Sequence, residues 1–212
     1  ADGSWSNDPS QIGIGMMPMY VKEGESYDKF TGDGIVQYTG YLNAGEFKII
    51  APKGLSNWAY ALGQGKITKD GGEDFKYRDG GADIDNLVVA DPGYYVLEVT
   101  TKENKLKVTP YNADYKYYKG EVVDYTTMKI GDTEMSPITT IEGVPNHDWY
   151  AEITLSAKTE MSFTSGEATW GSSIFPCAIG NKDDGVSIPC DKGTYKVYFN
   201  DISGAYSFVE QK

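Results

Sequence analysis

Aromatic and basic residues gather in one part of the chain. Trp58 and Tyr60 lie two residues apart between glycines, and Tyr77 follows with Lys76 and Arg78 on either side. Large rigid rings give contact area at little entropic cost, so they suit the C–H faces of sugars. The amine and the guanidinium fork can donate to hydroxyl oxygens. These five residues are therefore candidate carbohydrate-binding residues.

Trp170 is a sixth candidate, in the C-terminal half of the chain. Ala178-Ile179-Gly180 follows it, much as Ala61-Leu62-Gly63 follows Trp58. This recurrence also fits a structural role, because large aromatic side chains usually pack in cores. Both interpretations stay open for both tryptophans.

Other chemistry has weaker support. His147 stands beside Asp148, but a turn between strands explains that segment and no nucleophile elbow occurs in the chain. The acidic loop Lys69–Asn86 offers oxygens to calcium, yet its spacing does not match a calcium-binding loop and a solvated turn is the commoner outcome. Two small repeated units without long loops also argue against a glycosidase. We expect no catalytic residue, no metal and no cofactor.

Cys177 and Cys190 are the two cysteines of the chain. They end two short apolar segments separated by a polar turn, so a hairpin could bring them together as a disulfide. They are equally compatible with two small buried side chains.

The composition excludes several classes of protein. The 212 residues carry a net charge of −12 with a single arginine, which argues against a nucleic-acid partner. No apolar run approaches the length of a membrane span. Because the chain starts at Ala1, we interpret it as mature or trimmed, so membrane association would come only through a lipid anchor outside it.

The elements that must position these residues are strands. Short segments rich in Val, Ile, Thr and aromatic residues alternate with Gly, Asp and Asn, and no helical period continues beyond two turns. The segments are Phe47–Ile50, Tyr94–Val99, Leu106–Val108, Ala151–Leu155, Tyr195–Phe199 and Tyr206–Val209.

The chain also contains an internal repeat. Asp91–Val99 aligns with Asp191–Phe199 at an offset of 100, and Val88 aligns with Ile188. Upstream, Gly45–Ile49 resembles Thr159–Phe163, so the first copy carries a surplus that we assign to Lys69–Asn86. We expect an all-β protein of two tandem immunoglobulin-like β-sandwich domains.

The expected domain limits follow from the repeat. Residues 1–14 form a flexible N-terminal segment, residues 15–110 the first β-sandwich module and residues 111–212 the second. The join, Tyr111–Lys119, is too aromatic for a flexible linker, so we expect it to pack and to limit motion between the modules.

Several motifs carry a family resemblance. These are Met19–Lys22, Tyr38–Lys48, Gly193–Asp201 and Gly204–Phe208. In this order, across both units, they resemble the SusE/SusF group of outer-membrane glycan-binding lipoproteins of Bacteroides-type bacteria. The chain departs from that pattern in having only two modules, and its second module lacks the Ala-Gly-Glu-Phe-Lys motif.

The resemblance implies non-catalytic binding of an oligo- or polysaccharide at the cell surface, in support of a SusC/SusD-type outer-membrane transport complex. It implies a lipid-anchored protein of the outer membrane, with the periplasm as the alternative location. A different class also fits the sequence: a structural or adhesive surface protein whose sandwiches act as spacers or bind another protein.

Overall fold

The computed structural model describes residues 4–22, 27–28, 30–112, 114 and 120–212. In these ranges no α-helix forms, and two short 3-10 turns, η1 (Pro9–Gln11) and η2 (Pro52–Gly54), accompany the strands. No helix of the described residues is long and apolar enough to cross a membrane. The predicted all-β sandwich class is confirmed.

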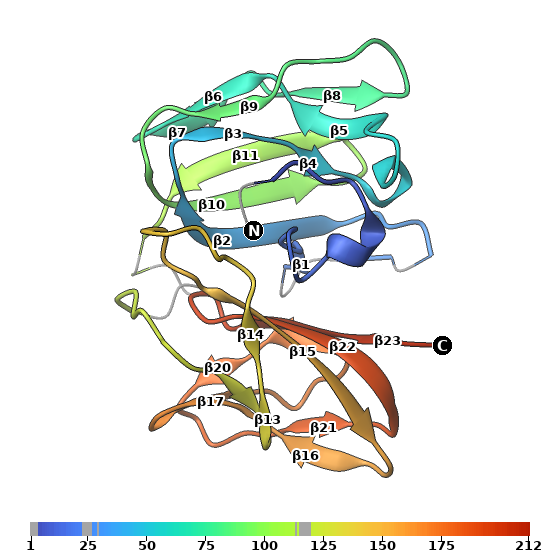
Figure 1. Cartoon of the computed structure of the whole chain (residues 1–212), viewed down its shortest axis with the longest axis vertical. Coiled ribbons are helices and arrows are strands. Elements are labelled where there is room, and N and C mark those ends of the chain that lie inside the picture. The colour runs from blue at the N-terminus through green and yellow to red at the C-terminus, as the bar shows by residue number, and fades with distance from the viewer. Residues whose placement is uncertain (1–3, 23–26, 29, 113, 115–119) are drawn as a thin grey trace.

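The N-terminal half, residues 4–110, contains a large sheet and a small one (Figure 1). The eight-stranded sheet has the order β1-β2-β10-β11-β7-β6-β9-β3, and the three-stranded sheet has the order β4-β5-β8. Their bounds are β1 Tyr20–Val21, β2 Ile35–Leu42, β3 Gly45–Phe47, β4 Ile49–Ile50, β5 Tyr60–Gly63, β6 Gly65–Thr68, β7 Gly71–Glu73, β8 Lys76–Asp79, β9 Leu87–Val89, β10 Gly93–Thr100 and β11 Lys105–Pro110.

The C-terminal half, residues 111–212, contains two five-stranded sheets, β14-β15-β22-β23-β19 and β13-β12-β17-β18-β20, and the pair β16-β21. Their bounds are β12 Lys129–Ile130, β13 Thr133–Glu134, β14 Ser136–Pro137, β15 Asp148–Leu155, β16 Thr159–Met161, β17 Phe163–Ser165, β18 Ala168–Gly171, β19 Cys177–Ile179, β20 Asn181–Lys182, β21 Ile188–Cys190, β22 Gly193–Asn200 and β23 Ala205–Glu210.

Each half has its own apolar core. Alternate residues of a strand face the same side, so Tyr95, Leu97 and their neighbours fill the core of the first half. In the second half, Phe163 stacks on Phe199 with ring centroids 4.1 Å apart at the centre of the core. The alternation that predicted these strands therefore also predicted which side of each strand faces the core of its own half.

Strand pairing confirms the internal repeat. The pairs β2–β10 and β15–β22 each align eight residues, and β3–β9 and β16–β21 are a second equivalent set. The pairing changes one position of the sequence alignment. Phe47 faces Leu87 in the first half, and the equivalent residue Met161 faces Ile188 in the second. Leu87, not Val88, is thus the counterpart of Ile188.

The same comparison corrects the alignment of the tryptophans. Phe163 faces Trp170 across β17–β18, whereas Ile49 faces Leu62 across β4–β5. Leu62 is therefore the structural counterpart of Trp170, and Trp58 has none. The extra residues of the first copy are divided between the β4–β5 loop, 51–59, where the second copy has only the turn 166–167, and the segment between Leu62 and Leu87, which contains most of the predicted Lys69–Asn86.

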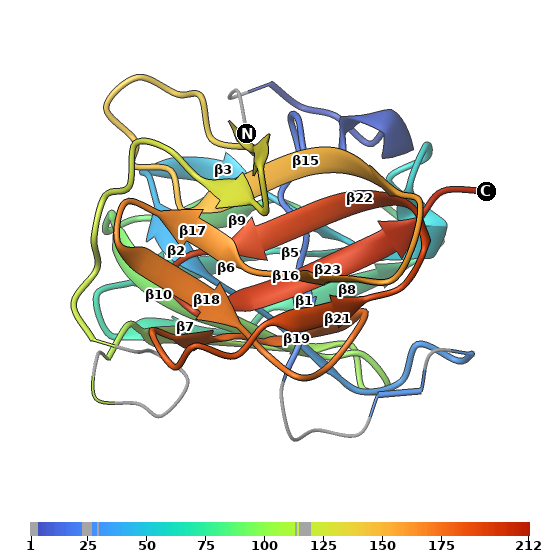
Figure 2. The same cartoon turned by 90° about the horizontal axis from the view of Figure 1, so that it is seen from below.

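The two halves lie one above the other along the long axis, with β2 next to the sheet of β15, β22 and β23 (Figure 1). From below, β15 and β22 lie in front of the strands of the N-terminal half (Figure 2). A mixed apolar cluster fills this junction, with Tyr20 and Val96 from one half and Ile138, Tyr198 and Ala205 from the other. The assignment of two separate domains stays a prediction.

Two segments run through the junction. Tyr111 packs against the junction cluster, and its hydroxyl donates to the Gly120 carbonyl (2.7 Å), whereas residues 113 and 115–119 of the expected join lie outside the described residues. Within the N-terminal segment, Ile12 also packs on this cluster. A Cβ on Gly13 would approach the Tyr198 ring to 2.6 Å, so the segment passes close to the second half.

Candidate functional site

The β4–β5 loop, residues 51–59, is a rigid support for Trp58. The N–H groups of Asn57 and Trp58 both donate to the Gly54 carbonyl, at 3.2 and 3.0 Å. A Cβ at Gly54 would lie 2.3 Å from the Tyr60 carbonyl oxygen, so glycine is required there. The Asn57 side chain accepts from the Ala59 N–H (2.9 Å) and closes the loop.

Trp58 has an unusual backbone conformation. Its φ is +59°, in the left-handed region that bulky residues avoid. Such a conformation costs about 1–2 kcal/mol relative to the right-handed one. Because Leu62 fills the core position that Trp170 fills in the second half, packing of the core does not explain this cost. Strained residues of this kind are concentrated at functional sites.

The N-terminal segment docks on this loop. The Asn7 carbonyl accepts from the Ser56 N–H (2.6 Å). With its amide oriented to face the donors, the Asn7 side-chain oxygen accepts from the Asn57 N–H (3.0 Å) and from Trp58 Nε1 (2.8 Å). Trp5 then meets Trp58 edge to face, with ring centroids 5.9 Å apart and an interplanar angle of 62°. We call Trp5, Asn7, Asn57 and Trp58 the tryptophan corner.

Arg78 supports Trp58 from the other side. Its Nη1 donates to the Trp58 carbonyl (3.2 Å) and to Asp83 Oδ1 (3.1 Å), and its Nε donates to the Gly81 carbonyl (3.0 Å). Through these contacts Arg78 joins the β4–β5 loop to residues 81–83, and the predicted donation from Arg78 to a ligand stays a prediction. Asp83 also accepts from Lys48 Nζ (3.2 Å), and this bond, the largest contribution, lowers the pKa of Asp83.

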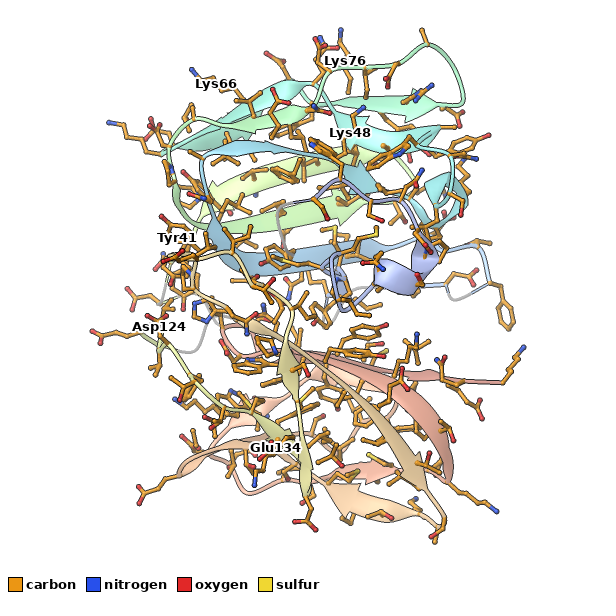
Figure 3. All side chains as sticks on the ribbon, in the orientation of Figure 1. Tyr41, Lys48, Lys66, Lys76, Asp124 and Glu134 are labelled. Carbon is orange, nitrogen blue, oxygen red and sulfur yellow. The ribbon has the colours of Figure 1, made fainter. Side chains whose placement is uncertain are left out.

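Tyr60 and Tyr77 lie on the neighbouring strands β5 and β8, whereas the sequence indicated a loop for Lys69–Asn86, the segment that contains Tyr77. Tyr60 faces Asp79 and Leu62 faces Tyr77, so both tyrosines lie on one face of the β5–β8 pair. Lys53 Nζ lies 4.2 Å from the centroid of the Tyr60 ring and 3.2 Å from Asp79 Oδ1. Lys76 lies on the opposite face and is exposed (Figure 3).

An open groove of about 510 Å³ lies beside Asp83. It is lined by Glu46, Lys48, Asp83, Ile84, Asp85, Asn86 and Val88. Asn86 Nδ2 donates to Glu46 Oε2 (2.7 Å), so much of the wall is polar and hydrogen-bonded. Its volume falls within the range of small-molecule sites, roughly 300–1,000 Å³, and its groups suit sugar hydroxyls. Arg78 links it to the tryptophan corner through Asp83.

Two of the predicted features are wrong. Trp170 is only 2% exposed and packs on Tyr125 and Phe199, so it offers no ring face to a ligand. Cys177 and Cys190 are free thiols on β19 and β21, strands of different sheets, because the segment between them does not form the expected hairpin. Burial raises the pKa of both thiols, that of Cys190 to about 12.

His147 and Asp148 belong to a buried polar cluster at the junction, which we call the junction network. Tyr38 from the first half donates to Asp148 Oδ2 (2.9 Å), and Asn200 Nδ2 donates to Asp148 Oδ1 (3.0 Å). Asp201 receives Trp149 Nε1 (2.7 Å) and faces His147 Nδ1 (2.8 Å). These buried groups are hydrogen-bonded to one another, which is typical of a polar network that holds the two halves together.

Across the junction, Asn200 Nδ2 also donates to the Thr39 carbonyl (2.8 Å). On the open side, Tyr94 lies between Tyr41 and His147, and Asp124 approaches His147 Nε2 to 3.5 Å. Figure 3 shows Tyr41 and Asp124 on the same side of the junction. In the described residues no group of three or more His, Cys, Asp or Glu side chains is arranged to hold a metal ion.

Sequence reasoning missed the residues that the N-terminal segment contributes to the site. Trp5 and Asn7 precede the first strand and belong to no repeated motif. The only signal in the sequence was the residue type, a tryptophan and an asparagine close together. The junction network did leave a signal, since the single histidine of the chain is followed directly by an aspartate and then a tryptophan.

No protein-family model, curated protein or solved structure was found to match this chain.

Proposed function

We propose that this protein binds an oligo- or polysaccharide without transforming it, at the tryptophan corner and the adjoining groove. The observation that carries the proposal is the strained, hydrogen-bonded presentation of Trp58 on a loop that the second half lacks. Preorganised aromatic surface lowers the entropic cost of binding, and the nearby polar groove supplies partners for hydroxyls.

The cellular role rests on the resemblance to the SusE/SusF group. We propose that the protein acts at the outer-membrane surface through a lipid anchor and supports glycan capture for a SusC/SusD-type transport complex. The motifs that carry the resemblance include Tyr38–Lys48, which spans the second part of β2 and all of β3 and ends at Lys48 in the groove.

The test is affinity electrophoresis through gels containing amylopectin, mixed-linkage β-glucan, galactomannan, inulin or mucin glycans. We expect the wild type to be retarded by at least one of them. Trp58→Gly should abolish this retardation, while its free energy of unfolding stays within about 1 kcal/mol of the wild type because glycine relieves the left-handed strain.

The matched control is Phe30→Ala, which removes an exposed ring from the β1–β2 connection and should leave retardation unchanged. Loss of several kcal/mol of stability in Trp58→Gly would identify Trp58 as a packing residue. Unretarded migration of the folded wild type in every gel would favour the structural or adhesive surface protein instead.

A further inference from the structure

Trp5 is the second indole of the tryptophan corner and is 54% exposed. Trp5 lies outside every strand and 3-10 turn, so contacts with neighbouring segments must hold it in place. Here the neighbouring residue Asn7 makes three hydrogen bonds, and all three end on residues 56–58 of the loop that carries Trp58. The segment is therefore attached to the candidate site itself.

The geometry of Asn7 explains how the corner is held. Its side-chain oxygen receives the indole N–H of Trp58 and the backbone N–H of Asn57, which fixes the ring of Trp58 relative to its own loop. Its carbonyl receives the Ser56 N–H, which fixes the N-terminal segment to the same loop. As a result, the ring of Trp5 stands at 62° to that of Trp58 rather than covering it face to face.

We propose that residues 4–8 form the second wall of the glycan site, with Trp5 contacting the ligand and Asn7 positioning both indoles. This inference rests on the proposed function and extends it to the N-terminal segment. Two rings at an angle can contact two consecutive sugar residues, so the ligand class is an oligosaccharide of at least two residues and not a monosaccharide.

The fluorescence of the protein offers a direct readout. The chain has four tryptophans, and Trp149 and Trp170 are each 2% exposed. Quenching by acrylamide therefore reports mainly on Trp5 and Trp58. In the absence of any glycan, Asn7→Ala should raise the quenching constant because the hydrogen bond to Trp58 Nε1 is lost. Asn7→Asp keeps the acceptor oxygen and should quench like the wild type.

Binding is then measured with the polysaccharide that retards the wild type and with oligosaccharides prepared from it. Trp5→Ala should weaken binding about tenfold, which corresponds to about 1.4 kcal/mol. It should also abolish the increase in affinity between a ligand of one sugar residue and a ligand of two. Asn7→Ala should weaken it similarly, whereas Asn7→Asp should restore it. Circular dichroism should show an unchanged fold, since residues 4–8 lie outside every strand.

The outcomes separate the two proposals. Retardation that survives Trp5→Ala but is lost in Trp58→Gly overturns this inference and leaves the proposed function in place. Stronger binding by Trp5→Ala also overturns it, because Trp5 would then cover the site instead of completing it. Absence of retardation in the wild type overturns the proposed function and the inference together.

Discussion

Asp148 is a carboxyl group with no exposed surface, at the point where β15 meets the first half of the chain. Burial raises its pKa to about 7, against hydrogen bonds from Asn200 and Tyr38 that favour the charged form. Burial also raises the pKa of the neighbouring Asp201. Transfer of a charge from water is costly, so at neutral pH the junction network contains carboxyl groups that hold protons more tightly than they do in the unfolded chain.

The first prediction concerns the pH dependence of stability at this residue. The pKa of Asp148 is higher in the folded protein than the ordinary value of 3.8, so the folded state binds its proton more tightly. The resulting stabilisation is complete below about pH 4 and is lost as the pH rises towards 7. Asp148→Asn should remove this decline and exceed the wild type at pH 8 by roughly 2–4 kcal/mol in urea unfolding.

The asparagine can keep both contacts, because its oxygen can face Asn200 Nδ2 while its N–H donates to the Tyr38 hydroxyl. Asp201→Asn is the contrasting variant, because its side chain would have one acceptor oxygen where Asp201 has two. Asp201 faces Trp149 Nε1, an indole that can only donate, and also His147 Nδ1. A parallel pH profile for Asp148→Asn and the wild type would contradict the assignment.

At the scale of elements, the repeat is built on a tyrosine that follows an Asp-x-Gly turn. The Tyr95 hydroxyl donates to the Asp91 carbonyl (2.7 Å), and the Tyr195 hydroxyl donates to the Asp191 carbonyl (3.2 Å). Each ring bends back over the start of its own strand, β10 or β22. The motif therefore fixes how the turn enters the central strand in both halves.

The second prediction compares the two glycines of this motif. A Cβ at Gly193 would lie 2.6 Å from the Tyr195 hydroxyl, whereas a Cβ at Gly93 would lie 3.5 Å from the Tyr95 ring. Gly193→Ala should therefore destabilise the protein by about 1–3 kcal/mol, as overpacking does. Gly93→Ala makes ordinary contact and should change stability by less than about 1 kcal/mol.

Chemical denaturation of both variants measures the difference. Because the clash at Gly193 involves the Tyr195 hydroxyl and two atoms of its ring, at 2.6 to 3.0 Å, Gly193→Ala should cost less in a Tyr195→Ala background than in the wild type. Equal effects at the two glycines would show that the two turns do not differ as the contacts indicate.

The repeat also shows what sequence reasoning could and could not provide. Alternating apolar residues placed β10 and β22 correctly, because the inward side of a central strand must be apolar. The same reasoning aligned Trp58 with Trp170 because both precede a similar tripeptide. Residue type is a weak guide where loops differ in length, and only the pairing of Ile49 with Leu62 identified the true counterpart.

For the site, the sequence singled out Tyr60, Lys76, Tyr77 and Arg78 by residue type, but it did not predict the adjacent strands β5 and β8 on which they lie, because the Gly- and Asp-rich segment Lys69–Asn86 indicates a loop. It could not provide the role of Arg78, whose partners depend on how the 80–86 loop folds back. Trp5 was equally out of reach, since docking of a terminal segment is decided by tertiary hydrogen bonds that have no period in the sequence.

At the scale of the whole molecule, the outward sides of two central sheets pack against each other. Val96 on β10 and Tyr198 on β22 point away from their own cores and meet in the junction cluster. The signal was present, because the run Tyr94–Leu97 is apolar on both sides of its strand, which is typical of a sheet that is covered on both faces. Hydrogen bonds across the same junction, from Tyr38 to Asp148 and from Asn200 to the Thr39 carbonyl, make its packing specific to the opposite half.

The last prediction follows from this junction: the two halves should unfold as one cooperative unit. Calorimetry of the wild type should give a single transition whose calorimetric and van't Hoff enthalpies agree.

Val96→Asp places a charge in the apolar cluster, where an unpaired charge is strongly unfavourable, so it should lower the stability of the junction and separate the unfolding of the halves. Val197→Ala, in the core of the second half, is the control: it should lower the melting temperature and keep a single transition. Two resolved transitions in the wild type would mean that the junction adds little to the stability of either half.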